Sequence, residues 1–260
     1  MSTTPSARLR LAESFTAIAE AAGARIMAWY GGARAEAKSD GSPLTEADLA
    51  AHDAILAGLA QACPEFPVVS EEDAARAEAP PAGAFILVDP LDGTREFLSG
   101  NGEFTVNIAL IEDGAPVVGV VLAPARGRLW WGAAGAGAGC RATGEGASRP
   151  LAARPPPAEG LVAVASRSHR DAETEAFLAG LPIAGLRSVG SSLKFCLVAA
   201  GEADLYPRFG PTMEWDTAAG QAVLEAAGGR VTTPAGAPFR YGKPGAAWRN
   251  GPFVARGAAA

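Results

Sequence analysis

The stretch "AFILVDPLDGTREF" (residues 84–97) runs from strand-forming apolar residues straight into two aspartates, Asp89 and Asp92. Pro90 drives Asp89 into an extended backbone, and the pair formed by Asp92 and Gly93 is a turn signal. One interpretation is a strand-end turn in which Asp92 caps a short helix just downstream. The other is a functional site, because a strand end and a tight turn would aim both carboxylates at one point.

Acidic residues recur at a strand end or a helix start elsewhere in the chain. Glu71 lies in "SEED" (70–73), and Asp48 and Asp216 stand where helices are expected to begin. Taken singly they could be a solvated charge run, half of a capping box and a helix cap. The aspartate pair with the Leu91 carbonyl between them offers all-oxygen ligands, which suit Mg²⁺, and the other acids form a set with this pair. The loops of a layered fold converge at such positions, so the set predicts one site.

Composition limits the class of protein. The 260 residues are 48% hydrophobic and 19% charged, as in a folded globule of one domain or two fused halves. A net charge of −6 argues against binding a nucleic-acid polymer or a polybasic membrane contact. Cys63, Cys140 and Cys196 are scattered, which indicates a reducing compartment and disfavours zinc. The sequence has no signal-peptide pattern and no membrane-spanning apolar run, so a cytoplasmic protein is expected.

Periodicity predicts an α+β first half with an antiparallel sheet. A helix is expected over about 8–30, and Thr45 opens a second one, with Asp48 at the capping-box position. "GAAGAGAG" (132–139) reads as hairpin turn rather than phosphate loop, because the G-x-G-x-x-G spacing is missing. Strands are expected at 66–73, 84–88, 104–111, 115–124 and around "RLWWG", the third and fourth as a hairpin.

Three consecutive prolines in "RPPPAEG" (154–160) mark the best boundary in the chain. Beyond it strands and helices alternate, which predicts an α/β second half. The expected division is therefore 1–155 and 156–260.

Several motifs together carry a resemblance to a known family. "SEED", "DPLDGT" (89–94) and "WDTAAG" (215–220) resemble the signature set of the lithium-sensitive, Mg²⁺-dependent phosphatase superfamily of inositol monophosphatases. The similarity extends over about residues 9–254. A second group of motifs resembles the 3′(2′),5′-bisphosphate nucleotidase branch: "SPLTEADLAAH" (42–52), "NGEFTVNIALI" (101–111), "ASRSH" (165–169), "GSSLKFCLVA" (190–199) and "LYPRFGPT" (205–212).

The resemblance implies a layered α-β-α-β-α sandwich and a site that takes two or three Mg²⁺ ions. It implies catalytic roles for Asp48, Thr94 and Glu71. The implied metal ligands are Glu71, Asp89, Leu91 through its carbonyl, Asp92 and Asp216. The implied substrate contacts are Glu71, Leu91, Asp92, Gly93, Thr94, Ser166, His169, Gly190, Lys194 and Asp216. The first half would hold most ligands, and the second the nucleotide-side residues and Asp216. One departure is Glu214, where an apolar residue is expected at the edge of the pocket.

The implied activity is hydrolysis of the 3′-phosphate of adenosine 3′,5′-bisphosphate (PAP) to AMP. A further implied reaction converts 3′-phosphoadenosine 5′-phosphosulfate (PAPS) to adenosine 5′-phosphosulfate (APS). Both reactions imply a role in sulfur metabolism. Two alternatives stay open: the same chemistry on inositol or sugar phosphates, and a metal-binding regulatory protein without turnover. Monomer and homodimer are both compatible with the resemblance, as is a peripheral position at the inner face of the cell membrane. G-x-S-x-G and P-loop motifs are absent from the sequence.

Overall fold

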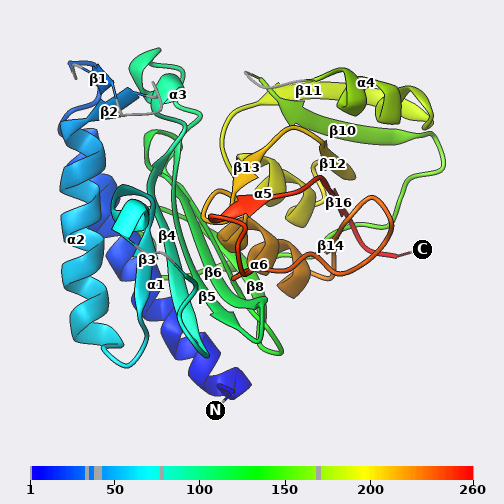
Figure 1. The fold of residues 1–260 in the computed structure, drawn as a ribbon. Coiled ribbons are helices and arrows are strands. Elements are labelled where there is room, and N and C mark those ends of the chain that lie inside the picture. The colour runs from blue at the N-terminus through cyan, green and yellow to red at the C-terminus, as the bar shows by residue number, and fades with distance from the viewer. Residues whose placement is uncertain (1, 33–34, 38–42, 77–78, 168–170, 260) are drawn as a thin grey trace.

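The computed structural model describes residues 2–32, 35–37, 43–76, 79–167 and 171–259, and these form five layers (Figure 1). Helices α1 (Pro5–Met27) and α2 (Glu46–Ala62) cover one face of a seven-stranded sheet, and α5 (Leu193–Ala199) and α6 (Ala218–Ala226) cover the other. A five-stranded sheet and α4 (Ala172–Ala179) complete the molecule. The predicted layered α-β-α-β-α sandwich is confirmed.

The large sheet follows the chain order β3-β4-β5-β6-β7-β8-β9. Only β3 and β4 pair in parallel, and the other neighbours are antiparallel, including the expected hairpin of β5 and β6. The strands are β3 (Val68–Ser70), β4 (Phe85–Asp92), β5 (Thr105–Glu112), β6 (Ala115–Ala123), β7 (Arg128–Ala133), β8 (Gly137–Ala142) and β9 (Arg149–Pro150).

The second sheet has the order β11-β10-β12-β16-β14, parallel around β10 and antiparallel around β16. Its strands are β10 (Leu161–Ser166), β11 (Ile183–Val189), β12 (Leu205–Arg208), β14 (Arg230–Thr232) and β16 (Phe253–Arg256). The remaining short elements are β1 (Ala35–Ala37), β2 (Pro43–Thr45), β13 (Thr212–Met213), β15 (Arg249–Asn250), α3 (Thr94–Leu98) and the 3₁₀ turns Glu71–Arg76 and Pro124–Arg126.

Both faces of the large sheet are buried. Ile86 and Val88 of β4 pack into the cluster that contains α1 and α2, whereas Phe85 and Leu87 pack into the cluster that contains α5 and α6. Successive residues of a strand point to opposite faces, so a continuous apolar run marks a strand covered on both sides. The second cluster draws side chains from both sides of residue 155.

Helix α6 lies against the sheet through two glycines. A Cβ on Gly119 of β6 would lie 2.4 Å from the Ala219 carbonyl oxygen, and one on Gly132 of β7 would lie 2.6 Å from the Val223 Cα. The missing side chains therefore let the helix backbone approach the strands closely. This contact positions the loop just before α6.

The three cysteines are buried and free, as expected of small apolar side chains. Burial raises the pKa of Cys63 to about 11 and that of Cys196 still further. His52 is buried between Ser70 and Asp73. Among the helices of the described ranges, none is both long and apolar enough to cross a membrane.

Candidate active site

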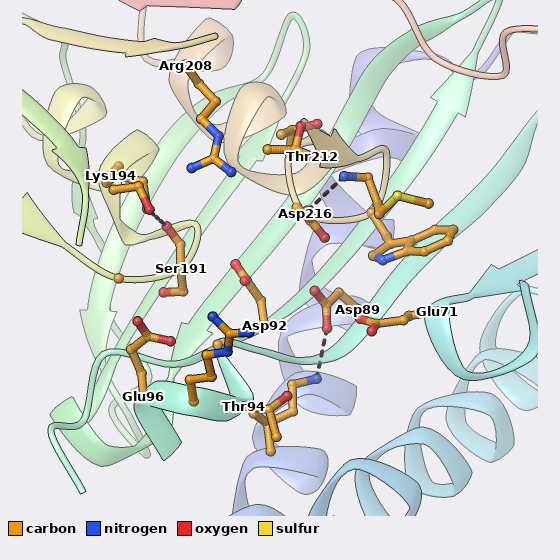
Figure 2. Close-up of a pocket in the computed structure, with 18 of the residues that line it drawn as sticks. Glu71, Asp89, Asp92, Thr94, Glu96, Ser191, Lys194, Arg208, Thr212 and Asp216 are labelled. Atoms are coloured by element: carbon orange, nitrogen blue, oxygen red, sulfur yellow. Dashed lines mark hydrogen bonds between the residues drawn. The ribbon is translucent and has the colours of Figure 1, made fainter. Parts of the chain in front are cut away.

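Strands, helices and loops from both halves of the chain surround a cavity of about 460 Å³. Figure 2 shows the acidic side chains Glu71, Asp89, Asp92 and Asp216 turned toward one another at its floor. They come from the 3₁₀ turn after β3, from β4 and from the loop before α6. The structure therefore brings together all four acidic side chains predicted as metal ligands.

The tightest part of this group is Glu71, Asp89 and Asp216. One carboxylate oxygen of each lies within 4.8 Å of the others. Asp89 is 1% exposed, and one of its oxygens accepts a hydrogen bond from the Leu91 amide at 3.0 Å. This hydrogen bond holds the Asp89 carboxylate against the backbone of the turn that the sequence singled out.

Asp92 is not a helix cap. Its Oδ2 accepts hydrogen bonds from the Ser192 amide at 2.6 Å and from the Asn107 side chain at 3.4 Å. The N-cap of α3 is Gly93, whose φ of 93° is left-handed and favours glycine. Burial raises the pKa of Asp92 to about 6, although Lys194 opposes the rise. The carboxylate is therefore held in the cavity by groups from a neighbouring strand and from the second half.

Asp216 does not cap α6 either, because the N-cap is Thr217. The Asp216 carboxylate accepts a hydrogen bond from the Met213 amide at 2.8 Å, as the dashed line in Figure 2 marks. Burial raises its pKa well above the ordinary value, and the nearby charges of Asp92 and Glu71 raise it further. Carboxylates crowded in this way repel one another, and a divalent cation removes the repulsion. The all-oxygen donor set fits Mg²⁺.

Asp48 joins a helix start to this floor. It forms the predicted capping box, and its Oδ2 accepts hydrogen bonds from the Thr45 amide at 2.8 Å and the Thr45 hydroxyl at 2.6 Å. Its Oδ1 accepts a hydrogen bond from the Thr94 hydroxyl at 3.4 Å. Asp48 is therefore both half of the capping box and the partner of Thr94.

The opposite wall carries the predicted nucleotide-side residues. Ser166, Gly190 and Lys194 line the same cavity as the acids, whereas His169 lies outside the described residues. Lys194 is not a solvated lysine, because it is 4% exposed and its Nζ donates to the Val189 carbonyl at 3.2 Å and to the Ser191 carbonyl. Burial lowers the pKa of Lys194 to about 8, with the charge of Asp92 opposing the change.

Sequence reasoning missed Arg208, which lines the cavity beside Tyr206 and is 7% exposed. It donates hydrogen bonds to the Gly210 carbonyl at 3.1 Å and the Pro211 carbonyl at 2.9 Å. An arginine inside the strand "LYPR" was the available signal, since a charged residue is seldom buried without a partner or a function.

Glu214 was expected at the pocket edge, but it lies outside the set of described residues that line the cavity. It is fully buried, pairs with Lys243 and accepts a hydrogen bond from the Gly242 amide at 2.6 Å. It anchors the 242–243 segment instead.

Residues 9–259 match the inositol monophosphatase family. The protein named 3′(2′),5′-bisphosphate nucleotidase CysQ in Escherichia coli O157:H7 is 48% identical over 86% of this chain and 91% of its own length. The protein of the same name in Buchnera aphidicola subsp. Acyrthosiphon pisum is 39% identical over 89% of this chain and 88% of its own length. The crystal structure of CysQ from Bacteroides thetaiotaomicron superposes with a TM-score of 0.81, is 39% identical and covers 96% of this chain and 98% of that one. The chain belongs to the inositol monophosphatase family.

Proposed function

We propose that the chain is a Mg²⁺-dependent 3′(2′),5′-bisphosphate nucleotidase that removes the 3′-phosphate of PAP to give AMP and phosphate. It hydrolyses PAPS to APS by the same route, and its place is in sulfur metabolism and the recycling of PAP. The names of the relatives that share about half of its residues support this activity.

One observation carries the proposal: a single cavity joins the acidic floor to a wall that bears buried cations. Glu71, Asp89 and Asp216 form the floor, and Lys194 and Arg208 line the opposite side. A bisphosphate has two dianionic groups at a fixed spacing, so it needs a metal-binding pole and a second positive pole. The cavity offers both.

Glu71, Asp89, Asp92, Asp216 and the Leu91 carbonyl would hold Mg²⁺, two or three ions in all. When bound, the metal would neutralise the phosphate, lower the pKa of a water and stabilise the leaving oxygen. Burial and mutual repulsion raise the pKa of Asp92 and Asp216, so protons compete with cations for these carboxylates, and a bound cation would remove the repulsion.

Thr94 and Asp48 would orient the attacking water. The Thr94 hydroxyl donates its proton to the Asp48 carboxylate, so its oxygen lone pairs are left to accept a hydrogen bond from a water. Asp48 is itself fixed by Thr45 and is 1% exposed. This chain of hydrogen bonds sets the direction from which water reaches the phosphorus.

The experiment is phosphate release over a small panel: PAP, PAPS, inositol 1-phosphate and fructose 1,6-bisphosphate. We expect the highest kcat/KM for PAP and PAPS. An equal or higher kcat/KM for inositol 1-phosphate would assign the chain to inositol or sugar phosphates. No turnover of any substrate with Mg²⁺ present would favour a metal-binding regulatory protein.

Removing the metal tests the same site. Excess chelator should abolish phosphate release, and added Mg²⁺ should restore it, because the proposed ligands are all oxygen. Ca²⁺ should inhibit, since its looser coordination fits the compact site poorly. Full turnover in excess chelator would contradict the proposed metal mechanism.

A further inference from the structure

Glu103 is a buried carboxylate that the proposed mechanism does not use. It lies between α3 and β5, and its side chain is 10% exposed. Glu103 is not one of the described residues that line the cavity. Arg126 donates to its Oε1 at 2.9 Å, and Arg167 donates to both of its oxygens at 3.1 Å. The Gly190 amide donates to Oε2 at 2.8 Å.

Two of these partners lie at the ends of strands of the second sheet. Arg167 directly follows Ser166 at the end of β10, and Gly190 directly follows the end of β11. Ser166 and Gly190 both line the cavity. Glu103 thus comes from the half that carries most of the acids, and it binds both strand ends that form the facing wall.

The segment 189–192 packs closely against Glu103, and hydrogen bonds to neighbouring residues hold its backbone in place. A Cβ on Gly190 would lie 2.7 Å from the Glu103 carbonyl oxygen. Ser192 donates its amide to Asp92, and Lys194 donates to the carbonyls of residues 189 and 191. Ser191 has a φ of 46°, in the left-handed region. A strained turn of this kind keeps its shape only while its partners hold it.

We propose that Glu103 is a positioning residue that fixes the nucleotide-side wall relative to the acidic floor, and thereby sets the preference for substrates with a second phosphate. The inference rests on the proposed nucleotidase activity. The scissile phosphate is bound at the floor, so a shift of the wall acts chiefly on the substrate groups that reach the wall, and Ser192 is the point at which the wall also contacts the floor, through Asp92. Such an effect appears in KM for the bisphosphate and spares turnover of a monophosphate.

The first experiment compares PAP with 3′-AMP in the full-length Glu103→Gln variant. The neutral side chain of glutamine cannot accept all four hydrogen bonds as strongly as the charged carboxylate does. The Gly190 amide or an arginine therefore loses a charged partner. We expect KM for PAP to rise about tenfold with kcat little changed, while kcat/KM for 3′-AMP is retained. Equal losses on both substrates, or an unchanged preference, would overturn the inference.

Glu112→Gln is the matched control. Glu112 ends the strand that Glu103 precedes, is also buried, and accepts hydrogen bonds from one arginine, Arg8, and one amide, that of Thr3. It lies far along β5 from the cavity wall. The control should lower the melting temperature without changing the preference for PAP over 3′-AMP.

If the Glu103→Gln variant does not fold, alanine variants of the two arginines that bind Glu103 can be compared instead, because they disturb the fold less. Arg126 and Arg167 share the carboxylate and are 41% and 46% exposed, but only Arg167 leads to the wall. Arg167→Ala should weaken the preference about twofold to fivefold, and Arg126→Ala should leave it unchanged. Identical effects of the two variants would overturn the inference.

A double variant separates positioning from direct contact. The losses from Glu103→Gln and Arg167→Ala should not add, because both break one link. Full additivity would mean that Arg167 acts on the substrate by itself, which contradicts the proposal. If the unaltered chain hydrolyses neither substrate, the proposed function fails, whereas an active chain with an unchanged preference in these variants refutes only the role of Glu103.

Discussion

At Asp92 burial and charge act in opposite directions, since burial raises its pKa to about 6 while the charge of Lys194 lowers it. The Asp92→Asn variant should keep the fold, because the amide oxygen can still accept the hydrogen bond from the Ser192 amide. Its kcat should fall at least about a hundredfold, since one charged metal ligand is lost. Melting curves and steady-state kinetics check the two halves of this expectation. A variant that keeps most of its activity would return Asp92 to the role of a turn residue.

Thr94 offers a finer test of water positioning. Thr94→Ala should lower kcat about tenfold to hundredfold and change KM little, because the hydroxyl acts on water rather than on the bound phosphate. Thr94→Ser is the control, since it keeps the hydroxyl that donates to Asp48. Rate measurements at saturating PAP and Mg²⁺ decide the matter, and equal losses in Ala and Ser would contradict the role of the hydroxyl.

Single residues also show where sequence reasoning ends. The motif residues Asp89, Asp92 and Asp216 could be predicted, because each stands at an element boundary that the sequence marks. The environment of Lys194 could not, since its ammonium group binds carbonyls presented by a left-handed turn at Ser191. Turn conformations of this kind depend on contacts with distant segments, here Glu103 and Asp92.

At the scale of elements, periodicity located the helices, the β5–β6 hairpin and the alternation of the second half. Periodicity did not reveal why polar and apolar residues alternate along the first part of β5. Thr105 and Asn107 look like solvent-facing positions, but they are buried and hydrogen-bond to Ser192 and Asp92 beneath the cavity. Polar side chains on one face can point to water or to a buried site, and the two patterns are identical in a single sequence.

The contact between α6 and the sheet gives a prediction for packing. A Cβ at Gly119 would meet the Ala219 carbonyl oxygen and the Ala222 side chain, so Gly119→Ala should push α6 away. We expect a loss of about 1–3 kcal/mol in the free energy of unfolding. We also expect a lower kcat, because Asp216 lies in the loop that leads into α6.

Denaturant unfolding and kinetics measure both effects of Gly119→Ala. Gly146→Ala is the control, since a Cβ there meets no described atom within 4 Å. If Gly119→Ala were as stable and active as the unaltered chain, close packing of α6 would not position Asp216.

In the whole molecule, hydrogen bonds to Asp204 join the proline-rich stretch 154–160 to the second sheet. These hydrogen bonds make the free energy of unfolding depend on pH. Asp204 is buried, which raises its pKa, but hydrogen bonds from Arg154 and the Val162 amide outweigh burial and leave the pKa below its usual value. A depressed carboxyl pKa stabilises the fold above the unfolded value of about 4, and this contribution is lost as the pH falls through the folded pKa.

Asp204→Asn should therefore be less stable than the unaltered chain at neutral pH, with the difference shrinking below about pH 4. Unfolding free energies measured at several pH values test this. Asp113→Asn is the control, because Asp113 is an exposed residue in the β5–β6 turn. A difference for Asp204→Asn that stays constant into acid would contradict the proposed linkage.

The burial of the large sheet on both faces has a consequence for synthesis on the ribosome. Helices α1 and α2 emerge before or with the strands they cover, but α5 and α6, which cover the other face, emerge later (Figure 1). Translation adds about 5–20 residues per second, so one apolar face of the nascent sheet stays uncovered for a time on the order of several seconds. Phe85, Leu87, Val121 and Trp130 lie on that face. A chaperone that shields apolar surface near the exit tunnel would therefore act on this chain between the translation of β9 and that of α6.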